Sequence, residues 1–144
     1  MQTSDLQMAE FAKECRDKGL SVTAQRLAVY RDISATDTHP TAEEVHDRVR
    51  RHFPTLSLAT VYKTLETFEK MDFVHKTRAT GEKARYDGNR VPHHHMICKT
   101  CGRIQDVYEP ALGNLALSGT SRGDFKIEDY RIDFYGVCGP CRKH

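Results

Sequence analysis

The apolar positions in the first half of the chain recur at the spacing of helices. Four segments begin at a residue that can cap a helix, and Ser4 and Thr41 also have Gln or Glu three residues later, as in a capping box. Gly19 ends the first segment and Pro54 the third. The expected caps are Ser4, Thr23, Thr41 and Ser57, and the expected buried faces are Leu6, Ala9 and Ala12; Leu27, Tyr30 and Ile33; Val45 and Val49; and Val61, Leu65 and Phe68.

The pattern changes to short alternating runs after the fourth helix. Residues 73–78 and 83–87 predict two strands joined around Gly81, and helices followed by a hairpin are typical of a winged helix-turn-helix domain. Turn-forming residues and Pro92 indicate a hinge at 89–92. We therefore expect an α+β protein with a DNA-binding domain at 1–88 and a small α/β domain at 93–144.

Three further strands are expected in the second domain, at about 94–97, 103–108 and 125–136. The alternation of the last one changes phase near Asp129, which predicts a bulge or break. Residues 111–123 hold three glycines and few helix formers, so they predict a short or irregular helix.

Composition narrows the function classes only slightly. The 144 residues have 38% hydrophobic residues, no Trp and a net charge of +2, so the core is modest. Residues 1–88 carry 14 basic and 14 acidic side chains, so nucleic-acid binding cannot be argued from bulk charge. No segment has the length of a membrane span, and the first residues do not form a signal-peptide pattern. We expect a cytoplasmic protein.

Four cysteines form two C-x-x-C pairs separated by 36 residues. In a reducing compartment such pairs bind metal more often than they form disulfides, which is the alternative. Four thiolates close a tetrahedral shell around zinc and leave no open position, so the site should be structural. The expected ligands of one zinc ion per chain are Cys98, Cys101, Cys138 and Cys141. The run His93-His94-His95 supplies further ligand types and suggests a second metal.

The fourth helix is a candidate for reading DNA. With Val61, Leu65 and Phe68 buried, its first turns present small and hydroxyl side chains that allow close entry into a major groove. An ordinary amphipathic helix with a solvated polar face remains the alternative. The candidate DNA-binding residues are Ala59, Thr60, Tyr62 and Lys63, with Arg26, Lys76 and Arg78 as further backbone contacts.

The chain resembles the ferric uptake regulator (Fur) family of bacterial metal-dependent repressors over nearly its whole length. The motifs that carry the resemblance are TAQR (23–26), HPTAEE (39–44), SLATVYKTL (57–65), RYD (85–87), HHHMIC (93–98), CGRIQD (101–106) and YGVCGPC (135–141). The resemblance implies a winged-helix domain, a dimerisation domain, and a homodimer that closes on a palindromic DNA operator when metal binds.

Within the family the chain is most similar to the peroxide-sensing repressor (PerR) branch. That similarity implies one regulatory Fe(II) or Mn(II) ion per chain, held by His39, Asp87, His93, His95 and Asp106. Imidazole and carboxylate ligands suit these ions, and His93 and His95 share one face of a strand while His94 points away. It also implies that peroxide oxidises His39 or His93, which releases the metal and the DNA.

Other readings stay open. An iron-responsive regulator of the same family is the nearest alternative, although such proteins usually carry Glu where this chain has Asp106; a zinc- or manganese-responsive regulator is a weaker one. A zinc-ribbon metalloenzyme is disfavoured because the chain has no H-E-x-x-H motif and no glutamate paired with the histidines. We therefore expect no enzymatic activity and no small organic substrate.

Overall fold

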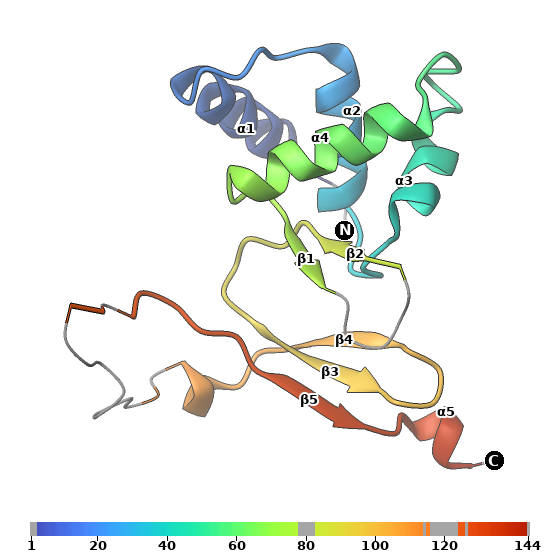
Figure 1. Ribbon diagram of the computed structural model, residues 1–144, viewed down its shortest axis with the longest axis vertical. Coiled ribbons are helices and arrows are strands. Elements are labelled where there is room, and N and C mark those ends of the chain that lie inside the picture. The colour runs from blue at the N-terminus through green and yellow to red at the C-terminus, as the bar shows by residue number, and fades with distance from the viewer. Residues whose placement is uncertain (1–2, 78–82, 114, 116–123, 126, 144) are drawn as a thin grey trace. The chain divides into compact units, whose positions relative to one another are not determined.

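The computed structural model of the protein describes residues 3–77, 83–113, 115, 124–125 and 127–143. The chain divides into two compact units, Met1–Arg90 and Val91–His144. Figure 1 shows helices and a hairpin in the N-terminal unit and a small sheet in the C-terminal unit. The predicted α+β class is confirmed. Within the described residues, no helix combines the length and the apolar character that crossing a membrane requires.

The helices of the N-terminal unit begin at the predicted caps. In each case the cap hydroxyl accepts a hydrogen bond from the backbone N–H three residues later, and the capping boxes at Ser4 and Thr41 are both formed. Such a cap stabilises a helix by about 1 kcal/mol, so local sequence sets these starts. The helices are α1 (Asp5–Asp17), α2 (Ala24–Ser34), α3 (Ala42–Val49) and α4 (Leu58–Lys70).

An aromatic cluster forms the centre of this unit. Phe11 stacks on Tyr30 with ring centroids 3.7 Å apart, and the edges of Phe68 and Phe73 pack against the pair. The buried faces predicted for α3 and α4 are confirmed, as are Tyr30 and Ile33 in α2.

The face predicted for α1 is wrong at Leu6 and Ala9 and confirmed at Ala12. Leu6 is 69% exposed, and the helix instead buries Met8, Phe11 and Cys15 along with Ala12. The predicted stripe contained two alanines, whereas the observed stripe places an aromatic ring and a thioether in the core and so removes more apolar area from water.

The hairpin consists of β1 (His75–Thr77) and β2 (Arg85–Asp87), which pair antiparallel with His75 opposite Asp87. Arg78 and the predicted turn at Gly81 lie outside the described residues. Gly88 follows β2 directly, and a Cβ atom there would lie 2.7 Å from the carbonyl oxygen of Ile33. Glycine therefore lets the end of β2 pass close to α2, which positions Asp87.

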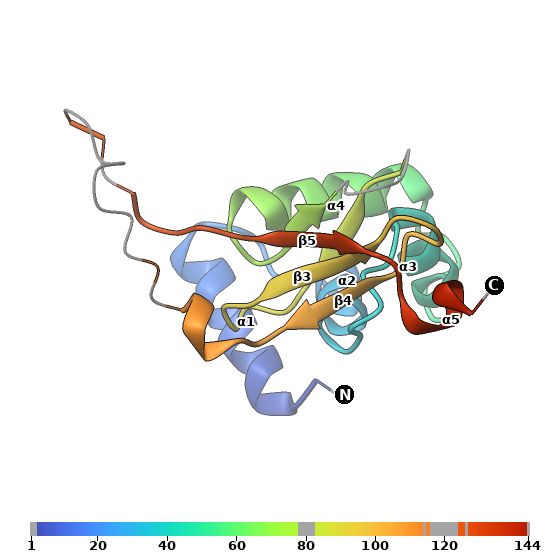
Figure 2. The same cartoon turned by 90° about the horizontal axis from the view of Figure 1, so that it is seen from below.

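The C-terminal unit contains a three-stranded sheet in the order β4-β3-β5, visible from below in Figure 2. Its strands are β3 (His94–Cys98), β4 (Ile104–Val107) and β5 (Asp133–Gly136). β4 pairs antiparallel with β3, and β5 pairs parallel with it. The first two strands are close to the predicted ranges.

The long strand predicted at 125–136 is wrong, because only its last four residues form β5. Before β5, the N–H of Ile132 donates to the His94 Nδ1 atom, and the Tyr130 hydroxyl donates to the carbonyl of Leu112. These bonds, each with a side chain at one end, replace a strand ladder after the change of phase at Asp129. The predicted irregular helix is represented by one 3-10 turn, η1 (Pro110–Leu112), and residues 114 and 116–123 lie outside the described set.

The C-terminal unit has little apolar core. Among its described residues, the buried apolar side chains are Ile97 and Cys98. A short helix that the sequence reading missed, α5 (Gly139–Arg142), follows β5 and carries Cys141. A unit with so few buried apolar groups needs another source of stability.

Candidate metal centres and nucleic-acid interface

Four sulfur atoms lie together in the C-terminal unit. Cys98 ends β3, Cys101 lies in the turn before β4, Cys138 caps α5, and Cys141 lies within it. The four Sγ atoms are within 4.8 Å of one another. Because β4 and β5 both pair with β3, the two C-x-x-C pairs lie at the same end of the sheet. The Cys101 and Cys138 sulfurs lie 3.8 Å apart, far longer than a disulfide bond, and the thiols are free.

The electrostatics of this cluster favour a cation. Backbone N–H groups, first that of Cys138 at 3.3 Å and then that of Cys101, lower the pKa of the Cys98 thiol to about 5. Hydrogen bonding to the sulfurs of Cys138 and Cys101 raises the pKa of Cys141 to about 12. A four-thiolate shell of this kind is consistent with structural zinc.

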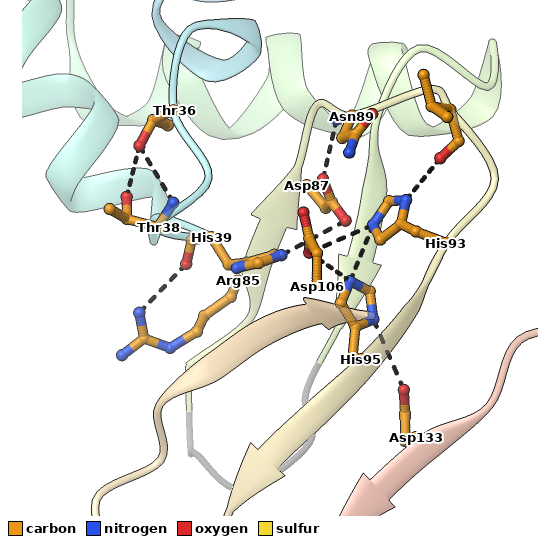
Figure 3. Close-up of polar contacts among 11 residues, drawn as sticks. Thr36, Thr38, His39, Arg85, Asp87, Asn89, His93, His95, Asp106 and Asp133 are labelled. Carbon is orange, nitrogen blue, oxygen red and sulfur yellow. Dashed lines mark hydrogen bonds and ion pairs between the residues drawn. The ribbon is translucent and has the colours of Figure 1, made fainter. Parts of the chain in front are cut away.

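In the N-terminal unit, His39 and Asp87 form a buried pair. The His39 Nε2 atom lies 3.5 Å from Asp87 Oδ2, and the two side chains are 1% and 3% exposed. The other carboxylate oxygen of Asp87 accepts a hydrogen bond from the N–H of Asn89 at 2.9 Å, which orients the group (Figure 3). A buried imidazole and carboxylate at this separation suit two ligands of one cation.

The strand β2 holds the backbone around His39. The Tyr86 N–H donates to the carbonyl of Pro40 at 2.9 Å, and the Arg85 guanidinium donates to the carbonyl of His39 at 3.2 Å. His39 has a φ of 53°, an uncommon backbone conformation for a residue other than glycine. Such a conformation persists where its surroundings enforce it, often at functional sites. Here it presents the imidazole next to Asp87.

In the C-terminal unit, three donor atoms converge from two strands. The Nε2 atoms of His93 and His95 lie 3.1 Å apart, and each lies 3.5 Å from Oδ1 of Asp106 on β4 (Figure 3). Two ligands bound at about 2.1 Å and at right angles would be about 3 Å apart, so the spacing fits a shared ion. The mixed imidazole and carboxylate chemistry fits Mn(II), Fe(II) or Zn(II).

His94 points away from this triad, as predicted. Its Nδ1 atom accepts the N–H of Ile132 at 3.0 Å, and its ring stacks on Tyr130. It therefore supports the segment before β5.

The candidate DNA-reading residues lie at the start of α4 and on α2. Ala59 and Lys63 are exposed, whereas Thr60 is half-buried, with its backbone N–H donating to the cap Ser57. The hydroxyl of the half-buried Tyr62 donates to Glu43 on α3 at 3.0 Å, and burial followed by this bond raises the pKa of Tyr62. Arg26 donates to the carbonyl of Ser21. Sequence reasoning gave no sign of the contact between Tyr62 and Glu43.

Comparison with known proteins gives independent evidence of the family to which this chain belongs. A sequence model described as the Ferric uptake regulator family matches residues 17–135, which include the five His and Asp donors and the first cysteine pair. The chain is 32% identical to the peroxide-responsive repressor PerR of Staphylococcus aureus strain Mu50 over 136 residues, which cover 94% of this chain and 92% of that protein.

Two solved structures share the fold. The Helicobacter pylori ferric uptake regulator Fur matches with a TM-score of 0.78 and 23% identity, over 99% of this chain and 97% of that one. A zinc uptake regulator complexed with zinc and DNA matches with a TM-score of 0.68 and 23% identity, over 98% and 97%.

Proposed function

We propose that this chain, which belongs to the ferric uptake regulator family, represses transcription when one divalent ion binds residues of both units. It is a transcriptional regulator rather than an enzyme. The ligands are His39, Asp87, His93, His95 and Asp106. The observation that carries the proposal is the presence of two incomplete donor sets with the same chemistry, a buried pair in the N-terminal unit and a convergent triad in the C-terminal unit.

Ligand number supports a single shared ion. Two donors are too few to hold Mn(II) or Fe(II) tightly, and three leave much of the shell to water, whereas five protein ligands leave about one position of an octahedral shell open. The chain also keeps the two sets close. Asp87 and His93 are six residues apart in the sequence, so their backbones can separate by at most about 20 Å.

An ion shared in this way controls the hinge at 89–92. It stabilises only those arrangements in which the two units can both reach it, and differential binding of this kind shifts the population of conformations. In a homodimer held by residues 93–144, the two winged-helix domains at 1–88 would then match the half-sites of a palindromic operator. We propose that this activity is cytoplasmic, because DNA and a reducing environment that keeps cysteine thiols free occur together there.

Helix α4 reads the DNA in this proposal. Ala59 and Thr60 allow close approach to the major groove, Tyr62 contacts a base or a thymine methyl, and Lys63 and Arg26 contact phosphates. Support comes from the fold shared with a regulator solved on DNA and from the exposure of Lys63.

Replacing Lys63 with Ala should weaken DNA binding about equally for all sequences. Each lost phosphate contact should also lower the slope of log affinity against log salt by about 1. The measurement is a salt titration of the Mn(II)-loaded protein on a duplex selected from random DNA. Lys70→Ala at the other end of α4 is the matched control. Equal slopes for Lys63→Ala and wild type would show that Lys63 does not contact a DNA phosphate.

Peroxide is the signal we propose. The similarity to a peroxide-responsive repressor and the carboxylate Asp106, in place of the Glu usual in iron-responsive relatives, support it. Fe(II), held by the five ligand residues, would activate hydrogen peroxide by splitting its O–O bond, while the imidazole is the group that is oxidised in the end. In the net change an imidazole carbon of His39 or His93 gains one oxygen atom while hydrogen peroxide becomes water. The oxidised ligand no longer holds the ion, so the hinge relaxes.

Mass spectrometry tests this signal. After Fe(II)-loaded protein is mixed with hydrogen peroxide, peptides with His39 or His93 should gain the mass of one oxygen atom, and Mn(II)-loaded protein should not change. Unmodified histidines together with iron-dependent DNA binding would favour the iron-responsive alternative. Operator binding that needs neither ion would contradict both.

A further inference from the structure

A row of three side chains crosses the sheet of the C-terminal unit. His95 on β3 pairs in register with Asp106 on β4 and with Asp133 on β5. Side chains of residues in register lie on the same face of a sheet. One imidazole therefore lies between two carboxylates from the neighbouring strands (Figure 3).

The two nitrogens of His95 face different groups. Its Nε2 atom lies 3.5 Å from Asp106, in the donor triad, whereas its Nδ1 atom lies 3.7 Å from Oδ1 of Asp133. The imidazole is nearly buried at 6% exposed, while the Asp133 side chain is 38% exposed at the edge of the sheet. Asp133 thus reaches the ring from the side opposite to the triad.

His93 shows the same arrangement with a different acceptor. Its Nδ1 atom lies 2.6 Å from the carbonyl oxygen of Val91, a distance at which the ring nitrogen must donate a proton. The Nε2 atom then carries the lone pair and faces the triad. A neutral imidazole can bind a metal only through the nitrogen that has no proton, and the hydrogen bond at the other nitrogen sets which one that is.

We propose that Asp133 is a positioning residue for the regulatory ion. At 3.7 Å its carboxylate is beyond hydrogen-bond distance, but its charge favours a proton on Nδ1 of His95 and so leaves the Nε2 lone pair directed at the site. Carboxylates that orient metal-binding histidines in this way commonly raise metal affinity. The inference rests on the proposed metal site, although the choice of tautomer concerns the protein without the ion.

Asp106 and Asp133 face different nitrogens of His95, so their effects on the His95 proton are opposite. Asp106 faces Nε2 at 3.5 Å, so the two carboxylates favour opposite tautomers of His95. Removal of Asp133 shifts the balance toward a proton on Nε2, in the triad, where a metal must displace it. Loss of Asp133 therefore weakens metal binding through the tautomer of His95 rather than through loss of a ligand.

The experiment compares Asp133→Ala, Asp133→Asn and the matched control Glu128→Ala, an exposed acidic residue in the same unit, in the full-length zinc-loaded protein. We expect Asp133→Ala to lower Mn(II) affinity about 10- to 100-fold. Asp133→Asn keeps an acceptor oxygen and should recover most of it, and Glu128→Ala should match wild type. Equal affinities of Asp133→Ala and Glu128→Ala would overturn the proposal.

A second readout separates this proposal from the proposed function. Nitrogen-15 NMR of the Mn(II)-free protein should find a larger share of His95 protonated on Nδ1 in wild type than in Asp133→Ala. An unchanged tautomer would overturn the role of Asp133. If wild-type protein fails to bind Mn(II), the proposed function fails, and the tautomer comparison still decides whether Asp133 directs the His95 proton.

Discussion

Replacing Cys98 with Ala should unfold the C-terminal unit while the N-terminal unit stays folded. The described part of the C-terminal unit buries few apolar side chains, and the four sulfurs join the end of β3 to α5. Structural zinc contributes on the order of 10 kcal/mol to small domains, more than the whole stability of many of them. The buried core cluster of the N-terminal unit, in contrast, runs from Met8 to Tyr86 and lies within that unit.

Zinc content and amide NMR spectra measure this outcome. We expect wild type to hold one zinc ion at the four cysteines and Cys98→Ala to hold none, and the amides of β3, β4 and β5 of the variant should collapse to the shifts of an unfolded chain. Cys15→Ala is the control, because Cys15 is buried on α1 and lies in the other unit. That variant should keep zinc and a folded C-terminal unit. A folded C-terminal sheet in zinc-free Cys98→Ala would show that the cluster is dispensable for folding.

Replacing His39 with Ala should abolish the Mn(II) dependence of DNA binding. His39 is the imidazole of the N-terminal donor pair, and β2 holds its backbone in an uncommon conformation beside Asp87. Loss of a residue that only orients a metal ligand lowers metal affinity about 10- to 100-fold, so loss of a direct ligand should lower Mn(II) affinity about 100-fold or more. DNA binding measured over a range of Mn(II) concentrations would report the loss.

The control for this variant is His52→Ala, an exposed histidine of the same unit just beyond α3. It should respond to Mn(II) like wild type. Circular dichroism should show that His39→Ala keeps its helices, since its side chain is not part of the hydrophobic core cluster. A normal Mn(II) response in His39→Ala would leave the ion to the C-terminal triad alone.

Local signals were sufficient to predict much of the N-terminal unit. The hydroxyl caps and the apolar spacing of α3 and α4 are determined within a few residues, and both are as expected. The alternation of His93 and His95 likewise predicted two imidazoles on one face with His94 turned away. The two C-x-x-C pairs also predicted the four-sulfur cluster although they lie 36 residues apart, because each pair supplies only half of a tetrahedral zinc shell.

Other features depend on contacts between distant segments, and the sequence pattern did not predict them. The face of α1 is chosen by Phe11 stacking on Tyr30 rather than by its own pattern. The shortening of the last strand depends on bonds from residues 130 and 132 to distant partners. In the sequence, Asp133 is an ordinary acidic residue in a predicted strand and carries no signal of a metal site. The parallel register of β5 on β3 is what brings it to His95.

The number of Mn(II) ions bound per chain tests most directly the claim that both units share one ion. Zinc-loaded protein would be dialysed against a series of Mn(II) concentrations, from the one that half-saturates wild type up to full saturation. We expect one ion per fully saturated chain, and we expect His39→Ala and Asp106→Ala to lose it alike although the residues belong to different units. Two ions per chain, or an ion that survives His39→Ala but not Asp106→Ala, would contradict the account.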